Sequence, residues 1–299
     1  MKSSPSHVRV GIVQQSCTDD RQTNVDATVA HIQHAASQGA QLVLLQELHT
    51  SLYFCQTENT HLFDLAETIP GPTTHVLSHL ARALNIVIVA SLFEKRAVGL
   101  YHNTAVVIEK NGDIAGSYRK MHIPDDPGYY EKFYFTPGDL GFKPIATSVG
   151  KLGVLVCWDQ WYPEAARLMT LAGADLLLYP TAIGWGSQES DPAEKIRQRD
   201  AWIVIQRAHA IANGLTVLVA NRVGFEPAIP QSSQGIHFWG SSFIAGPQGE
   251  IITQANQDSS EILLADLNLH QHEHVRRGWP FLRDRRIDHY QGIIQRYLD

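Results

Sequence analysis

Cysteine is scarce in this chain: the 299 residues include three, Cys17, Cys55 and Cys157. So small and odd a number cannot form a disulfide framework, and it fits a reducing compartment. The chain also lacks the roughly 20 consecutive apolar residues that a transmembrane helix needs, and its N-terminal segment has no apolar run of signal-peptide length. We therefore expect a soluble, cytoplasmic protein that does not insert into a membrane.

Basic residues are not in excess either, because the formal net charge is −6. A domain with this balance has no basic footprint for nucleic acid, and its charge mildly favours a cationic ligand. Glycine-rich motifs that cradle phosphates are absent as well: residues 138–141 are not followed by Lys-Ser or Lys-Thr, and GxGxxG does not occur. Nothing in the sequence requires a nucleotide, an organic cofactor or a metal ion.

Strand-like and helix-like segments alternate along the whole chain, which predicts one α/β domain over residues 1–299. Asn111 and Gly112 are a strong hairpin signal, and Pro163 suits the first turn of a helix. The number of strands fits a pair of packed sheets with helices outside better than a single open sheet. Helices are expected at 19–37, 74–84, 194–212 and from 163 onward, and strands at 8–13, 41–46, 85–91, 101–109, 114–118, 152–156, 175–179, 216–220, 240–245, 250–253 and 261–267.

Three polar residues, Glu47, Lys120 and Cys157, stand where a predicted strand or hairpin ends and an irregular segment begins. Ligand sites of α/β proteins gather beyond such strand ends. A carboxylate, an ammonium and a thiol that meet there form a self-consistent site, because the carboxylate can accept the thiol proton and later activate water. The ammonium, together with the backbone N–H of Trp158, can face the oxyanion of a tetrahedral intermediate.

Each of the three also has an ordinary structural interpretation. Glu47 could cap a turn, Lys120 could be a surface charge, and Cys157 could be a small apolar residue at a strand end. The functional interpretation of Cys157 predicts an exposed thiol, whose thiolate form is favoured by the N-terminus of the helix that begins near Pro163.

The segments around these residues resemble the carbon–nitrogen hydrolase (nitrilase) superfamily over residues 8–270. The resemblance is carried by LLQELHT (44–50), YRKMHIP (118–124), VLVCWDQWYPEAAR (154–167), YPTAIG (179–184), ANRVG (220–224) and GSSFIAGPQGE (240–250). It implies a four-layer α-β-β-α sandwich, homodimers or higher homo-oligomers, and a catalytic triad of Glu47, Lys120 and Cys157. Many members have a second glutamate that orients the lysine and the substrate. The match is Glu131, whose alternative is a surface charge beside Lys132.

Within the superfamily, the segments most similar to N-carbamoylputrescine amidases are RKMHIPDDPGYYEKFYFTPGD (119–139), CWDQWYPEAAR (157–167) and RDAW (199–202). This similarity implies cofactor-free hydrolysis of a ureido C–N bond in polyamine biosynthesis. Cys157 would carry a carbamoyl-thioester and Glu47 would act as base and acid, releasing putrescine, ammonia and carbon dioxide. The implied partner is a small carbamoylated amine.

A substrate with a terminal ammonium needs a carboxylate or an aromatic ring at the far end of its pocket. Tyr130 and Glu189 are the preferred pair. The loop TAIGWGSQESDP departs from the shorter family pattern, so a solvated loop glutamate is the alternative for Glu189. The remaining candidates in the two irregular loops are Asp125, Asp126, Tyr129 and Trp185.

Three alternatives to this function stay open, the first being transfer of the acyl group to an amine instead of water. A carbamoyl amino acid or β-ureidopropionate would require an arginine near its carboxylate, and Arg197 and Arg199 lie in the helix predicted after the loop. The chain could also be an inactive homologue that serves as an oligomeric scaffold, although all three triad positions are filled.

Residues 268–299 form a polar and aromatic tail that we expect to pack at a subunit interface. Its histidines His270, His272 and His274 alternate, and on a strand they would share one face as a metal site. Solvated histidines are the simpler interpretation, so we expect no metal.

Overall fold

Two six-stranded β-sheets form the centre of the structure, a computed structural model that describes residues 6–298. Both sheets are parallel in the middle and antiparallel at their edges. The first has the order β15 (Glu261–Asn268), β1 (His7–Gln14), β2 (Leu42–Leu44), β3 (Val87–Ala97), β4 (Leu100–Ile108) and β5 (Ile114–Arg119). The second has the order β14 (Ile251–Gln254), β13 (Phe243–Ala245), β10 (Thr216–Ala220), β8 (Leu176–Pro180), β7 (Gly150–Val154) and β6 (Ile145–Thr147).

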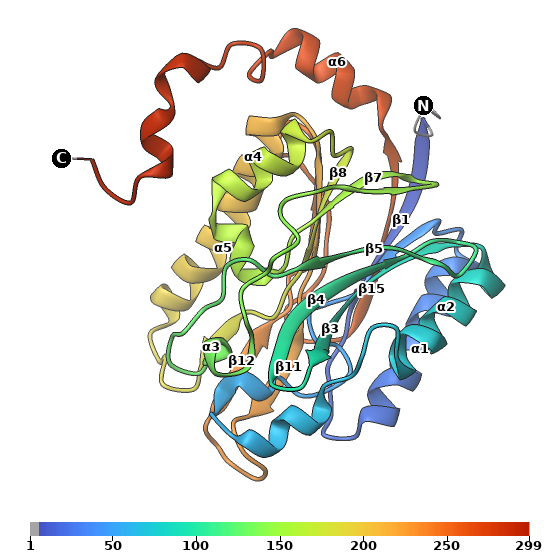
Figure 1. The fold of residues 1–299 in the computed structure, drawn as a ribbon, viewed down its shortest axis with the longest axis vertical. Helices are drawn as coiled ribbons and strands as arrows, with labels where there is room; N and C mark the ends of the chain where they lie inside the picture. The colour runs from blue at the N-terminus through green and yellow to red at the C-terminus, as the bar shows by residue number, and fades with distance from the viewer. Residues whose placement is uncertain (1–5, 299) are drawn as a thin grey trace.

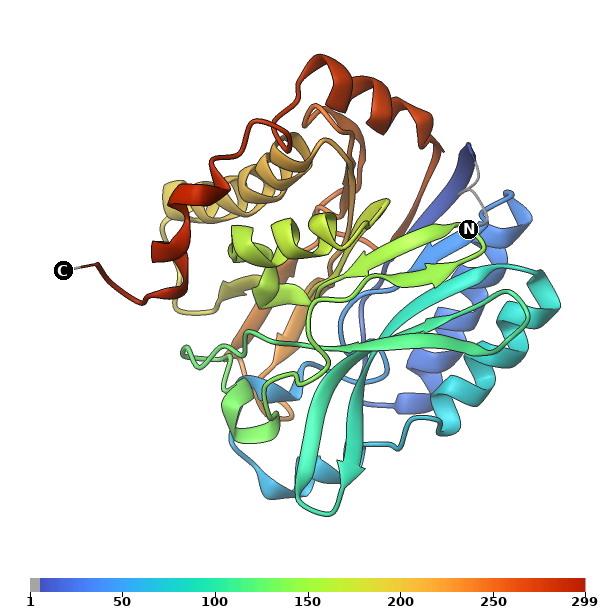
Figure 2. The same cartoon turned by 45° about the horizontal axis from the view of Figure 1, so that its top comes forward.

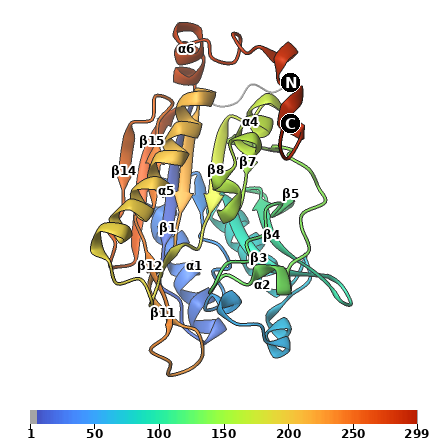
Figure 3. The same ribbon diagram turned by 90° about the vertical axis from the view of Figure 1, so that its left-hand side faces the viewer.

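Helices cover the outer face of each sheet, which gives the four-layer α-β-β-α sandwich (Figures 1 and 3). The first sheet carries α1 (Arg21–Ser37) and α2 (Pro72–Leu84), and the second carries α4 (Pro163–Leu171) and α5 (Pro192–Asn213). Local sequence explains these boundaries: Pro163 opens α4, and Asp191 caps α5, which ends at Gly214 in a left-handed conformation. The expected fold class is confirmed, and each predicted helix and strand overlaps an observed one.

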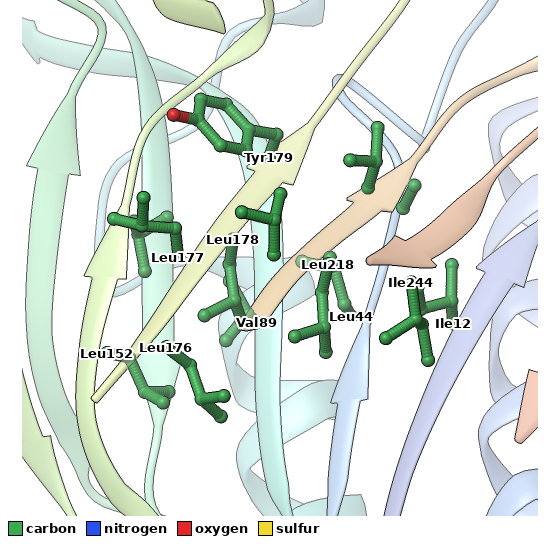
Figure 4. Close-up of a cluster of buried hydrophobic side chains, with 14 of the residues drawn as sticks. Ile12, Leu44, Val89, Leu152, Leu176, Leu177, Leu178, Tyr179, Leu218 and Ile244 are labelled. Carbon is green, nitrogen blue, oxygen red and sulfur yellow. The ribbon is translucent and has the colours of Figure 1, made fainter. Parts of the chain in front are cut away.

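The main hydrophobic core lies between the two sheets. Figure 4 shows Ile12, Leu44 and Val89 of the first sheet near Leu178 and Leu218 of the second. These side chains are fully buried, and both faces of the central strands are covered. Strands of this kind read as continuous apolar runs, which is why the sequence located them well.

A small third sheet was not predicted. It has the order β11 (Val223–Pro227), β12 (Gly235–Trp239) and β9 (Gly184–Gly186). The loop that follows TAIG therefore begins as strand β9, which pairs with the hairpin of β11 and β12. The irregular run 120–141 contains the four-residue helix α3 (Glu131–Tyr134). Short 3₁₀ helices add η1 (Phe54–Gln56), η2 (Thr60–Leu65) and η3 (Cys157–Trp161).

The C-terminal segment begins with helix α6 (His270–Gly278), followed by η4 (Ile287–His289) and η5 (Gln291–Ile294). Figure 2 shows it running along one end of the molecule and then outward. On α6 the three histidines do not share a face: His272 is buried and its Nε2 lies 2.9 Å from Thr216 Oγ1, whereas His270 and His274 are exposed. Over residues 6–298, no cluster of side chains is suited to a metal ion, and no helix has the length and apolarity to span a membrane.

Candidate active site

Glu47, Lys120 and Glu131 meet beyond the ends of the strands that precede them. Lys120 directly follows β5, Glu47 lies three residues after β2, and Glu131 starts α3. The Lys120 ammonium donates to Glu47 Oε1 at 2.9 Å and to Glu131 Oε2 at 2.6 Å. All three side chains are 0% exposed. This burial contradicts the surface-charge interpretation of both Lys120 and Glu131.

The charges of this trio depend on one another. Burial opposes a charge on Lys120, but Glu131 and Glu47 more than offset it and raise the lysine pKa well above its usual value. For Glu131, burial raises the pKa, and Lys120 does not fully cancel that effect. The remaining Glu131 oxygen, Oε1, accepts a 2.6 Å hydrogen bond from the Tyr53 hydroxyl. Removing one partner from such a buried set typically destabilises a fold by about 3–5 kcal/mol.

Asn103 is a member of the site that the sequence analysis missed. It sits in β4, fully buried, and its Nδ2 donates to Glu47 Oε1 at 2.6 Å. Ser91 supports it by donating to Asn103 Oδ1 at 2.9 Å. Glu47 Oε1 is therefore held by Lys120 and Asn103, while no donor within residues 6–298 binds the buried Oε2. Asn103 lies between His102 and Thr104 at the polar start of β4, so the strand's sequence did not single it out.

Cys157 begins η3 with a φ of 44°, a conformation that non-glycine residues rarely adopt. The carboxylate of Asp159 holds this turn, because it accepts the Val156 N–H at 2.9 Å and the Tyr118 hydroxyl at 2.8 Å. Cys157 is 4% exposed, and its Sγ lies 3.6 Å from the Ala182 carbonyl oxygen.

The structure corrects the expected state of this thiol. We predicted an exposed group biased toward thiolate by a helix N-terminus. Instead η3 separates Cys157 from α4, and burial followed by the charge of Glu47 raises the thiol pKa well above its usual value, although Lys120 opposes this. Burial and the neighbouring carboxylate therefore favour the protonated form of the Cys157 thiol.

Cys157 lines a cavity of about 940 Å³. Trp158 and Glu189, both expected to bind substrate, line it too. The other lining residues are Pro124, Asp126, Pro127, Tyr129, Trp161, Ala182, Ile183, Gly184, Gly186, Gln188, Glu194, Arg197, Gln198, Ala201 and Trp239.

Two expected substrate-binding residues, Asp125 and Tyr130, are not among the described residues that line the cavity. Their neighbours Asp126 and Tyr129 take these positions. The reason is a tight turn in which the Tyr129 N–H donates to the Asp126 carbonyl, with Gly128 at a φ of 82°. Such a turn decides which side chains face inward, and the sequence did not show its register.

The two arginines of the alternative function are separated. Arg197 lines the cavity and its guanidinium lies 2.7 Å from the carboxylate of Glu194. Arg199 lies in a different surface hollow, beside Asp200. Trp185 is not among the described residues that line the cavity, and its indole N–H donates to the Lys195 carbonyl of α5 at 3.1 Å.

Residues 9–277 match the family model of the carbon-nitrogen hydrolases. The chain belongs to the carbon–nitrogen hydrolase family. The family resemblance inferred from the motifs is thereby confirmed. The carbon–nitrogen hydrolase from Helicobacter pylori G27 has a crystal structure that superposes with a TM-score of 0.94 at 53% sequence identity, covering 98% of this chain and 100% of that one.

Two curated relatives of this carbon–nitrogen hydrolase are similar over nearly their whole length. The N-carbamoylputrescine amidase of Oryza sativa subsp. japonica is 42% identical, with 97% of this chain and 95% of that protein covered. The citrullinase of Francisella tularensis subsp. tularensis is 41% identical, with 98% and 100% covered.

Proposed function

We propose that the protein hydrolyses the ureido C–N bond of a carbamoylated amine, with N-carbamoylputrescine as the substrate. The observation that carries this proposal is the composition of the cavity wall: the buried Cys157 thiol shares it with the carboxylates of Asp126, Glu189 and Glu194. Such a wall suits a ligand with an electrophilic carbon and a distant cation. The similarity to the rice N-carbamoylputrescine amidase supports the same substrate.

In the first half-reaction, Cys157 Sγ attacks the ureido carbon while Glu47 takes the thiol proton through Oε2. Since burial and Glu47 raise the pKa of the thiol, proton removal accompanies the attack. The Lys120 ammonium and the Trp158 backbone N–H stabilise the tetrahedral oxyanion. The bond to the terminal nitrogen then breaks, Glu47 returns its proton to that nitrogen, and ammonia leaves a carbamoyl-thioester on Cys157.

In the second half-reaction, water attacks the thioester carbon while Glu47 accepts a proton from it. The C–S bond breaks and the proton returns to the Cys157 sulfur. The product is a carbamate, which releases carbon dioxide to give the free amine. Lys120 stays charged throughout because its two glutamates hold its pKa high, and Glu131 keeps its ammonium in place.

Glu189 is our proposed partner for the ammonium of the substrate. Its Oε1 accepts the backbone N–H of Asp191 at 2.9 Å, and within residues 6–298 it forms no ion pair that would offset its charge. Glu194 differs because Arg197 lies against it. The uncompensated carboxylate is the better site for a cation.

A carbamoyl amino acid is the second candidate substrate, because Arg197 also lines the cavity. Its side chain is 63% exposed, so it can rotate from Glu194 toward a substrate carboxylate. Citrulline has both an ammonium and a carboxylate at its far end and would use Glu189 and Arg197 together. The similarity to the Francisella citrullinase supports this candidate.

The two candidate substrate classes can be separated by measuring ammonia release from N-carbamoylputrescine, citrulline and N-carbamoyl-β-alanine. We expect the highest kcat/KM for N-carbamoylputrescine, a KM raised about 10-fold or more by Glu189→Gln, and little effect of Arg197→Gln. Faster turnover of a carbamoyl amino acid, lost in Arg197→Gln, would establish the second candidate. If no substrate is hydrolysed and none protects Cys157 from alkylation, the inactive-scaffold alternative replaces both.

We also propose that the protein is a homo-oligomer with its tail at the interface. Monomeric proteins rarely expose large contiguous apolar surface. Here the tail exposes Trp279, Phe281, Ile287, Tyr290, Ile293, Ile294, Tyr297 and Leu298. Helices α4 and α5 expose Leu168, Leu171, Val204 and Ile211, and Figure 1 shows the tail continuing past α4 on the same side of the molecule. A second copy of the chain would cover this surface.

A further inference from the structure

The turn that carries Glu47 is under backbone strain. Leu48, the next residue, has a φ of 50°, a conformation unfavourable for a residue with a branched side chain. Strained backbone persists where surrounding contacts over-determine it. Those contacts therefore decide where the Glu47 carboxylate lies relative to Cys157.

Arg222 makes more of these contacts than any other single side chain. Beside it, the Thr181 carbonyl accepts the Glu47 N–H, and the Ser91 hydroxyl accepts the Leu48 N–H. Arg222 follows β10, is fully buried, and donates to three carbonyl oxygens of the turn: Glu47 at 3.2 Å through Nε, and Leu48 at 2.5 Å and Ser51 at 3.0 Å through Nη2. A guanidinium presents its N–H groups in one rigid plane. One side chain thus binds the carbonyl of the proposed base and the strained residue after it.

Glu226 completes the arrangement. Its Oε1 accepts from Arg222 Nη1 at 2.7 Å, and its Oε2 accepts the backbone N–H of Tyr53 at 2.5 Å. The Tyr53 hydroxyl donates to Glu131, the partner of Lys120. The buried pair therefore holds the turn at Glu47 and, through Tyr53, contacts the other carboxylate of the site.

We propose that the buried Arg222–Glu226 pair is a positioning device that holds the segment 47–53, so that Glu47 faces the Cys157 thiol and Glu131 stays on Lys120. This inference rests on the proposed function, because it assigns Glu47 the role of base. Neither Arg222 nor Glu226 lines the cavity. Loss of the pair therefore slows proton transfer and leaves substrate binding unchanged.

Arg222→Lys and Glu226→Gln test the device. Lysine keeps the charge but lacks the planar fork, and glutamine cannot accept from both Arg222 and Tyr53. Because a displacement of about 1 Å at a reacting group costs about 100-fold in rate, we expect kcat to fall about 100-fold in Arg222→Lys and about 10-fold in Glu226→Gln. KM should stay within about 2-fold of wild type, since general-base geometry affects the chemical step.

Alkylation of Cys157 by iodoacetamide gives a readout that needs no substrate. A displaced Glu47 removes the thiol proton less well, so the alkylation rate at pH 7 should fall about 10-fold or more. If wild type turns over none of the ureido substrates but both variants still slow alkylation, the proposed function fails while the positioning device stands.

Arg21→Lys is the matched control. Arg21 binds Glu67 at 2.8 Å and Thr73 Oγ1 at 3.0 Å, linking α1 to α2 away from the cavity. It should lower thermal stability without changing kcat or alkylation. Folded Arg222→Lys and Glu226→Gln proteins with wild-type rates would overturn the proposal. So would loss of folding in both, because the pair would then support the fold as a whole.

Discussion

The site around Lys120 and the C-terminal tail each depart from the usual distribution of residues in a globular protein, in which charged side chains are exposed and apolar side chains are buried. The site buries two carboxylates and an ammonium completely, whereas the tail leaves Ile294 88% exposed and Tyr297 83% exposed. Buried charge is expensive unless every member has a partner, and exposed apolar surface is unfavourable unless something covers it. The first region meets its requirement within one chain, and for the second we have proposed that another copy of the chain covers the apolar surface.

This contrast separates chemistry from assembly. Changes in the buried site should alter catalysis and leave assembly intact, and changes in the tail should do the reverse. Four experiments test this separation.

The largest effect is expected from Cys157→Ala. Loss of the nucleophile should lower kcat on the order of 10⁶-fold, with the oligomer and circular dichroism spectrum unchanged. Cys157→Ser should be nearly as inactive, since Glu47 would have to activate a much less acidic hydroxyl. Cys17→Ser is the control and should retain activity. Undiminished ammonia release by Cys157→Ala would refute the assignment of the nucleophile.

Glu131→Gln should reduce kcat and change its pH dependence. Burial raises the pKa of Glu131 to about 7, so in wild type kcat/KM should fall as the pH drops through that value and the carboxylate pair gains a proton. Glu131→Gln removes one of the two negative charges, which makes protonation of the remaining carboxylate less favourable. The fall of kcat/KM on the acid side of the pH–rate profile (its acid limb) should therefore move to lower pH. The kcat itself should be about 100-fold lower, because Lys120 loses a charged partner.

The pH–rate profiles of both proteins, measured with one substrate, provide the check. An unchanged acid limb in Glu131→Gln would mean that Glu131 is not coupled to the ionisation that controls the rate.

A chain that ends after Gly278 should lose its oligomeric state while its active site stays intact. The truncation removes all eight exposed apolar side chains of the tail. Light scattering after size-exclusion chromatography would show a smaller particle, and Cys157 should still be alkylated at the wild-type rate. Val98→Asp is the matched surface control, because Val98 is 96% exposed on a distant hairpin. An unchanged mass after truncation would contradict an interface built on the tail.

The smallest effect concerns His272, which attaches α6 to β10. Burial lowers its pKa to about 4, so the folded chain keeps it neutral while the unfolded chain binds a proton near pH 6.5. Between these values the unfolded state holds more protons, so stability is lost as pH falls, by up to about 3 kcal/mol for this group. The free energy of unfolding, measured with denaturant at pH 7.5 and pH 5, should differ less between the two pH values in His272→Gln than in wild type. Equal differences would exclude His272 as a contributor.

Local pattern was enough to locate much of this protein. Apolar runs identified the central strands, and Pro163 marked the start of α4. Family motifs then selected Glu47, Lys120 and Cys157 from the polar residues at the strand ends. The fold class and the family were predictable because they depend on neighbours in sequence and on recognisable motifs. The roles of the three residues stay predictions.

What remained hidden depends on contacts between distant segments. Arg222 reaches Glu47 across 175 positions, and Glu226 reaches Tyr53 across 173. The burial of Cys157, which raises the pKa of its thiol, involves distant segments such as the one that carries Ala182. The choice of Asp126 over Asp125 follows from one turn. The sequence by itself determined the elements and the family. Tertiary packing decided which polar side chains are buried, how they are oriented and which side chains face the cavity, because desolvation and hydrogen bonding arise only when distant segments meet.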